Sequence, residues 1–286
     1  MLDTISKRLF VRPPNETLYH YTSLAGMLGI IESGVLRASD IRYMNDSAEL
    51  RHTLDLMVNQ VTRRLVAGAD NPTLLNQLLD WLSHRIVGGP LLFGISFRAN
   101  GNLLSQWRGY SVHGKGVSLG FNPAHIASCA SEPGFQLARC IYDSGEQVKL
   151  IEQIIDTIEQ LAGKLGPDSN GSSWSKVFSK IEGDILRIAA VLKHPTFAEE
   201  EEWRLVSPVM DIGHAIQFRE GSSMLIPFYA FELRDRVSGR IKLDHVYLGP
   251  TSNAELSIKS IDLFLSHSRA SPARGISYCQ IPYRQR

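Results

Sequence analysis

The clearest hydrophobic pattern in the chain covers residues 18–36, where an alternating segment runs directly into a helical one. Leu18–Ser23 is short, aromatic and β-branched, as a buried strand would be. Beyond it, apolar residues recur at the spacing of an amphipathic helix, at Leu24, Met27, Leu28, Ile31 and Val35. Thr22 or Ser23 can cap this helix, and Gly34 can end it in a left-handed conformation. The sequence therefore predicts a strand that feeds a helix.

The predicted strand carries a histidine close to its junction with the helix. Alternation along a strand places Leu18, His20 and Thr22 on one face, and Tyr19 and Tyr21 on the other. Polar side chains at the end of a strand, beside a helix N-terminus, are a suitable place for an anionic ligand. A structural histidine with satisfied hydrogen bonds is the alternative interpretation.

The remaining pattern alternates helices and strands along the chain without internal repeats. Helices are predicted over residues 50–65, 74–86, 102–110, 147–161, 174–192 and 253–265. Strands are predicted over residues 91–97, 117–121, 135–142, 202–206, 214–219, 224–233, 241–248 and 277–280. Strands near the start, middle and end predict a single α+β domain over residues 1–286, built around a mixed or split β-sheet. The helical hairpin of residues 145–192 is expected to be an insertion on one side of the sheet.

Four consecutive glutamates, residues 199–202, stand at the mouth of the predicted strand 202–206. In that strand alternate residues face the core, while Glu202 and Arg204 face the other way. The same parity places Glu200 beside Glu202. Carboxylates this close repel one another, and burial would raise the pKa of at least one of them. The alternative is a solvated loop in which Glu202 and Arg204 each pair elsewhere.

Composition narrows the class of protein. The chain has 286 residues, of which 43% are hydrophobic and 21% charged, and its net charge is +1. This balance argues against a strong, indiscriminate nucleic-acid binder. Cys129, Cys140 and Cys279 lie far apart and match no zinc or disulfide pattern, so we expect reduced thiols in a cytoplasmic protein. We also expect no signal peptide, no membrane span and no metal site.

Several motifs, taken in order, carry a resemblance to known families. They are Leu-Tyr-His-Tyr-Thr-Ser, Met-Asn-Asp-Ser-Ala-Glu, Gln-Trp-Arg-Gly-Tyr, Gly-Val-Ser-Leu-Gly-Phe and Glu-Glu-Glu-Trp-Arg-Leu. Over residues 17–286 this set resembles a bacterial domain family that includes AbiGi-like abortive-infection proteins, which act in phage defence. The opening is also similar to the first strand and helix of the ADP-ribosyltransferase superfamily, especially its DarT-like and RNA phosphotransferase-like branches.

The second resemblance implies an ADP-ribosyltransferase-like fold that binds NAD as its substrate. His20 would hydrogen-bond the adenosine ribose, and the backbone near Tyr21 and Thr22 would hold the nicotinamide amide. Ser118 would occupy the middle strand position, where the superfamily has Tyr or Ser. The other residues expected at the NAD site are Asn45, which lies just outside a predicted helix cap, and Trp107 or Tyr110, which would stack on nicotinamide.

The same resemblance places the catalytic carboxylate at Glu202, with Glu200 two residues earlier as in the Glu-x-Glu of some branches. The acidic run leaves the choice between them open. Breaking the nicotinamide–ribose bond builds positive charge on the ribose, which a nearby carboxylate stabilises. The implied activity is transfer of ADP-ribose to a protein or nucleic acid, or NAD hydrolysis, in a phage-defence or toxin effector. It requires His20 and Glu202 to meet around one dinucleotide-sized hollow.

Two other functions remain open from the sequence. A non-catalytic module that senses a nucleotide or a phage component would keep the cleft without turnover. A nuclease could use His20 and Glu202 as an acid–base pair, which is the weaker alternative.

Overall fold

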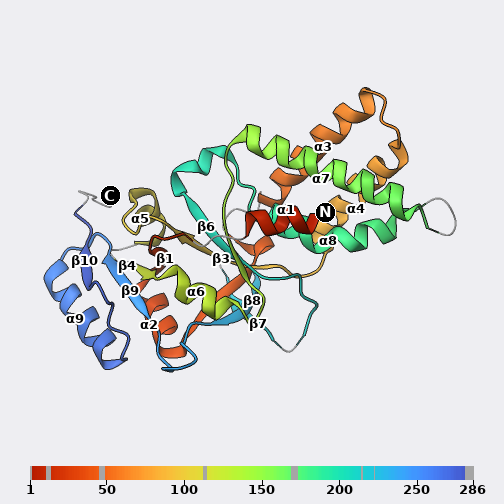
Figure 1. The fold of residues 1–286 in the computed structure, drawn as a ribbon. Helices are drawn as coiled ribbons and strands as arrows, with labels where there is room; N and C mark the ends of the chain where they lie inside the picture. Colours follow the sequence, from red (N-terminus) through yellow and green to blue (C-terminus); the bar gives the residue numbers. More distant parts are fainter. Residues whose placement is uncertain are drawn as a thin grey trace.

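In this computed structural model the described residues are 2–10, 14–44, 49–111, 115–168, 173–213, 215–221 and 223–280. Ten strands within them form one open, mixed sheet in which β10 and β9 are parallel and the other pairs antiparallel (Figure 1). The strands are β1 (Leu18–Ser23), β2 (Val35–Asp40), β3 (Phe93–Arg98), β4 (Gly116–Phe121), β5 (Gln136–Arg139), β6 (Glu202–Val206), β7 (Ile216–Glu220), β8 (Leu225–Glu232), β9 (Leu243–Leu248) and β10 (Ile276–Tyr278). The predicted α+β class with flanking helices is confirmed.

The helices of the described residues fall into two groups. The helices that pack directly on the sheet are α2 (Leu24–Ser33), α5 (Leu104–Tyr110), α6 (Pro123–Ala130) and α9 (Ala254–His267). The others gather beyond β6, at the upper right of Figure 1: α1 (Leu2–Leu9), α3 (Glu49–Val66), α4 (Pro72–Gly88), α7 (Ser144–Leu165) and α8 (Ser175–Ala189). Short 3₁₀ turns are η1 (Ile41–Tyr43) and η3 (Pro195–Glu200).

Strand β3 is the branch point of the sheet. The order β10-β9-β4-β1-β3-β2-β8-β7 runs through it, and β6 followed by β5 leaves from its other edge. On the first edge, β1 pairs with β3 at Arg98, whereas β2 pairs at Phe93 and Gly94. The sheet therefore splits between β1 and β2, opposite the middle of β3.

The two faces of the sheet differ in what covers them. The α2 face carries His20 and Phe97 and packs on α2, α6 and α9 in one large apolar core. The α5 face carries Tyr19, Tyr21 and Arg98 and is covered by α5 at one end. At its other end, beyond β6, it packs against the second group of helices.

The predicted strand–helix unit at the start of the chain is confirmed, except that Val35 lies in β2 and not on the helix. Ser23 is the helix cap, and its side chain accepts a hydrogen bond of 3.1 Å from the backbone N–H of Gly26. Gly34 ends α2 with a φ of 76°, a conformation that glycine adopts without a Cβ clash. This unit places β1 in the middle of the sheet.

The predicted helical hairpin of residues 145–192 exists as α7 and α8. It does not pack alone, because its apolar stripe shares one core with α1, α3 and α4. Representative members of that core are Ile151, Ile155 and Ile185 from the hairpin, and Met57 and Leu78 from α3 and α4. The hairpin is thus one part of a larger helical layer.

Candidate functional site

Five charged side chains meet on the α5 face where β3, β6 and the segment before η3 come together. We call Arg98, Lys193, Glu200, Glu202 and Arg204 the ion-pair cluster. One oxygen of Glu202, Oε1, accepts from Arg204 Nε at 2.9 Å and from Arg204 Nη2 at 2.8 Å. Its other oxygen accepts from Lys193 Nζ at 2.6 Å and lies 3.4 Å from Arg98 Nη1. Both oxygens of Glu202 are therefore engaged by cations.

Glu200 completes the cluster at its outer edge. Its Oε2 accepts from Lys193 Nζ and from Arg98 Nη2, both at 2.6 Å. Glu201, between the two acids, has a left-handed backbone with a φ of 42°, and its own side chain is 55% exposed. The turn at Glu201 lets Glu200 and Glu202 reach the same ammonium group, so the predicted closeness of the two carboxylates is confirmed.

Burial separates the two carboxylates. The side chain of Glu202 has no exposed surface, whereas that of Glu200 is 16% exposed. Burial alone would raise the pKa of Glu202, but Arg204, Arg98 and Lys193 outweigh it and hold that pKa well below its usual range. Glu202 is therefore ionised at neutral pH. The sequence-based alternative of a solvated loop is wrong for this residue.

Positive charge exceeds negative charge inside the cluster. Three cations face two carboxylates, and the side chains of Arg98 and Lys193 are only 8% and 6% exposed. The Nε of Arg98 is buried and has no hydrogen-bond partner among the described residues. A buried excess of positive charge in a low-dielectric setting attracts an anion.

Two aromatic rings stand at the edge of the cluster. Tyr110, at the end of α5, and Phe197, in η3, are each 36% exposed. The Nζ of Lys193 lies 5.2 Å from the centre of the Phe197 ring. Burial raises the pKa of Tyr110, and the charge of Arg98 opposes that shift, so the phenol lies within the field of the cluster. Exposed rings beside buried cations combine a stacking surface with charge.

The other residues expected near this site lie in the packing between α5 and the sheet. Trp107 is fully buried, and its Nε1 donates to Asn102 Oδ1 at 2.8 Å. The Tyr21 hydroxyl donates to the carbonyl of Asn100 and accepts from the N–H of Leu103, both at 2.8 Å. The prediction that Trp107 can stack on a ligand is wrong, because the ring serves as core.

Ser118 lies directly opposite Tyr21 on β4 and is also fully buried. Its Oγ has no hydrogen-bond partner among the described residues. Tyr21 thus lies beside Ser118 on the neighbouring strand and beside Trp107, whose ring centre is 4.9 Å from its own, in the packing beneath α5. None of the three presents surface to a ligand.

His20 and Thr22 lie on the opposite face of the sheet from Glu202. Tyr19 pairs with Arg98, and Arg98 pairs with Glu202, so these three side chains share the α5 face. His20, one residue on, points to the α2 face, where its ring centre lies 6.0 Å from that of Phe97. The expectation that His20 and Glu202 line one hollow is wrong, and the cause is strand parity.

His20 has a structural role at the split in the sheet. Its Nδ1 lies 3.1 Å from the carbonyl oxygen of Ser96, on the part of β3 between the attachments of β1 and β2. Burial lowers the pKa of His20, with the hydrogen bond to Ser96 acting in the opposite sense. The uncharged ring closes the gap that the diverging strands leave.

Asn45 lies outside the described residues. Three members of the site, Arg98, Lys193 and Phe197, had not been singled out from the sequence. Arg98 ends an apolar strand and Lys193 follows a long helix. In the sequence each is a charged residue next to a buried element, which is common and does not indicate a site. Their meeting depends on pairing across the sheet.

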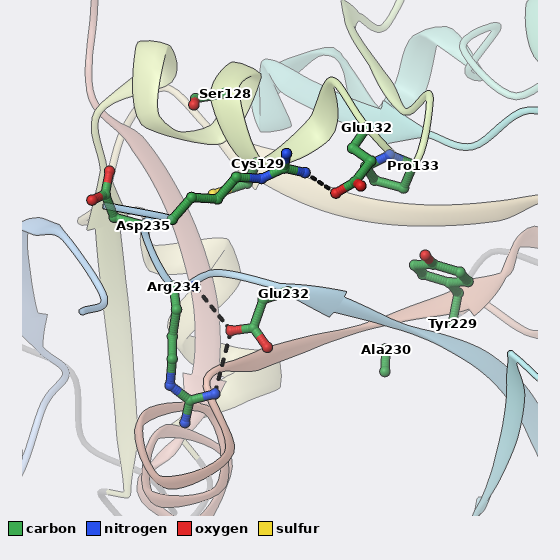
Figure 2. Close-up of a pocket in the computed structure, with 10 residues that line it drawn as sticks. Ser128, Cys129, Glu132, Pro133, Tyr229, Ala230, Glu232, Arg234 and Asp235 are labelled. Atoms are coloured by element: carbon green, nitrogen blue, oxygen red, sulfur yellow. Dashed lines mark hydrogen bonds and ion pairs between the residues drawn. The ribbon is translucent and has the colours of Figure 1, made fainter. Parts of the chain in front are cut away.

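A separate hollow of about 360 Å³ lies between the end of α6 and β8 (Figure 2). Its charged side chains are paired: Glu132 with Arg236, Glu232 with Arg234, and Asp235 with Lys242. Cys129 in its wall lies 3.9 Å from His125 Nε2, but that nitrogen is 3.0 Å from the carbonyl of Leu233. Burial raises the pKa of Cys129. This cysteine is therefore not an activated nucleophile.

Comparison with known proteins gives one match. The model of a family described as "Protein of unknown function (DUF2971)" matches residues 106–205. No curated protein and no solved structure matches the chain. The matched segment holds Trp107, Tyr110 and all of the ion-pair cluster except Arg98. The similarity to AbiGi-like proteins and to ADP-ribosyltransferases stays a prediction. Among the described helices, none combines the length and apolar character needed to cross a bilayer.

Proposed function

We propose that this chain binds a nucleotide of the NAD or ADP-ribose type at the ion-pair cluster, on the α5 face. One observation carries the proposal: a buried excess of positive charge lies beside the exposed rings of Tyr110 and Phe197, and within the described residues the Nε of Arg98 has no hydrogen-bond partner. Phosphate groups bind guanidinium and ammonium groups, and flat bases stack on aromatic rings.

The geometry supports binding better than catalysis by Glu202. A carboxylate that stabilises a developing ribose cation needs an oxygen free to approach the sugar. Both oxygens of Glu202 already contact Arg204, Lys193 and Arg98. We therefore assign Glu202 to positioning the cations. In this proposal the chain is a nucleotide-sensing module, in keeping with its resemblance to phage-defence proteins.

NAD consumption remains the second candidate, and it depends on Glu200. This carboxylate is the more exposed of the two, and only its Oε2 makes contacts that the structure records. Its Oε1 could meet a ribose hydroxyl of a nucleotide whose phosphates lie on Arg98. Glu200, not Glu202, would then be the catalytic residue, and ADP-ribose would pass to water or to a macromolecular acceptor.

Binding is tested by isothermal titration calorimetry with NAD and ADP-ribose on the full chain. Phe197→Ala removes a rim ring without exposing a buried charge, and we expect a loss of about tenfold in affinity, within the range of aromatic stacking. Phe218→Ala is the matched control, because Phe218 is a more exposed ring on β7, 61% accessible. Equal affinity in wild type and Phe197→Ala, or no heat with either nucleotide, would refute the binding site.

Turnover is tested in the same samples by nicotinamide release in the presence of cell extract. Binding without release supports the sensor. Release that Glu200→Gln abolishes, with nucleotide affinity kept, supports the second candidate. Release that survives Glu200→Gln would exclude Glu200 as the catalytic residue.

A further inference from the structure

A second hollow, of about 560 Å³, lies at the far end of the α2 face. It is formed by the C-terminal ends of α2 and α9 and by the turn between β8 and β9. Its apolar lining comes from Ile31, Ile241 and Phe264. This volume is in the range of small-molecule sites and far exceeds what a phosphate ion alone would fill.

The charged lining of this hollow is mostly basic. Arg234, Arg240, His267 and Arg269 line it, against the single carboxylate of Glu32. Arg234 is already engaged, since it pairs with Glu232 at 3.3 Å and donates to the carbonyl of Glu32 at 3.1 Å.

The side chains of Arg240 and Arg269 have no recorded partner among the described residues, in contrast to the fully paired charges of the hollow in Figure 2. Arg240 and Arg269 are both exposed, and as far as the described residues go they line the hollow as two unpaired cations with one carboxylate, which leaves the hollow positive. A positive hollow concentrates anions, and guanidinium groups bind phosphate through two parallel hydrogen bonds.

The backbone conformation of Arg269 is a second observation in favour of a ligand site. This residue adopts a left-handed conformation with a φ of 55°, in the turn just after the α9 cap at Ser268. At the end of α2 the left-handed residue is Gly34, the residue type that this conformation favours. An arginine there gives up backbone stability, and its side chain makes no hydrogen bond or ion pair with another described residue. Strained backbone of this kind is found more often at ligand sites than elsewhere in a fold.

We infer that this hollow binds a nucleoside diphosphate, with the phosphates on Arg240 and Arg269 and the base on the apolar lining that includes Phe264. The hydroxyl of Ser268, which also lines the hollow, is a donor suited to a phosphate or ribose oxygen. The site lies on the opposite side of the sheet from the ion-pair cluster, and it does not depend on the function proposed there.

The test is calorimetric titration of ADP into the Phe197→Ala protein, in which the ion-pair cluster is weakened. We expect Arg269→Gly and Arg240→Gln each to lower the affinity for ADP at least about tenfold, as loss of one charge-assisted phosphate contact should. Arg236→Gln is the matched control, because Arg236 is already paired with Glu132, and it should bind ADP like its parent. Unchanged affinity in Arg269→Gly would overturn the inference.

Arg269→Gly also separates binding from folding. Glycine relieves the left-handed strain, so the melting temperature should stay the same or rise by up to about 3 °C while ADP affinity falls. Inorganic pyrophosphate provides the second arm. It should bind more weakly than ADP, because it cannot cover the apolar lining; equal affinity would overturn the nucleoside part of the assignment.

Discussion

Replacing Glu202 with glutamine tests whether the ion-pair cluster is held together by one buried charge. The substitution preserves shape and removes the negative charge that Arg98, Lys193 and Arg204 surround. All three cations are at most 8% exposed, so they would remain buried against a neutral amide. Removing one partner of a buried ion pair destabilises a protein by about 3–5 kcal/mol. That is a large part of a typical total stability of about 5–15 kcal/mol.

The assay is urea unfolding of wild type and Glu202→Gln, followed by far-UV circular dichroism. Glu201→Gln is the matched control, because Glu201 is 55% exposed and lies 3.7 Å from Arg139 at the surface. We expect it to change the unfolding free energy by less than about 1 kcal/mol. A change of under about 1 kcal/mol in Glu202→Gln as well would refute the reasoning.

The pH dependence of the same comparison follows from the depressed pKa of Glu202. A carboxyl group whose pKa is lowered in the folded state stabilises the protein fully above its unfolded pKa, which is about 4.3. The stabilisation is lost as the pH falls through the folded value. The difference between wild type and Glu202→Gln should therefore be constant near neutral pH and shrink only below about pH 4.

Three further outcomes are expected. Trp107→Ala should lower the unfolding free energy by about 3–5 kcal/mol, since the ring is fully buried between α5 and the sheet; a loss below about 1 kcal/mol would mean that the ring is not core. The ring of His20 should titrate below pH 6.5 in NMR spectra, because burial disfavours its charged form; stability linked to it is present above that pH and lost on acidification, and a pKa above 6.5 would contradict its placement. Cys129 should react with iodoacetamide more slowly than a free cysteine at pH 7.5, because burial raises its thiol pKa; faster reaction would contradict the paired environment of its hollow.

Local sequence patterns predicted the parts of this fold that are decided locally. The junction of β1 with α2 follows from side-chain alternation, a serine cap and a terminal glycine, all within residues 18–34. The closeness of Glu200 and Glu202 was also predicted, but it arises from the left-handed turn at Glu201 and not from strand parity, because Glu200 lies in η3. The long helices α3, α4, α7 and α8 follow from apolar spacing.

Features decided by long-range contacts escaped prediction. Strand β2 has a mixed sequence, Val-Leu-Arg-Ala-Ser-Asp, and exists because it pairs with β8 nearly 200 residues later. Helix α6 carried a local signal, Asn122 as cap followed by Pro123, that was too short to stand out. Helix α1 is defined by its packing on α8 and the helical core.

The separation of His20 from Glu202 has the same origin. Each strand was predicted correctly, but the relative facing of two strands depends on register, which here passes from Tyr19 on β1 through Arg98 on β3 to Glu202 on β6. A shift of one residue in either pairing would have placed both side chains on one face. The sequence identifies candidate residues of the site, but it does not show which of them lie on the same face of the sheet.

The most direct test of the central claim is a crystal structure of the protein soaked with ADP-ribose. We expect phosphate oxygens within hydrogen-bonding distance of Arg98 or Lys193, and a ring of the ligand against Tyr110 or Phe197. A ligand bound through His20 on the α2 face, or an empty ion-pair cluster at saturating ADP-ribose, would contradict the account.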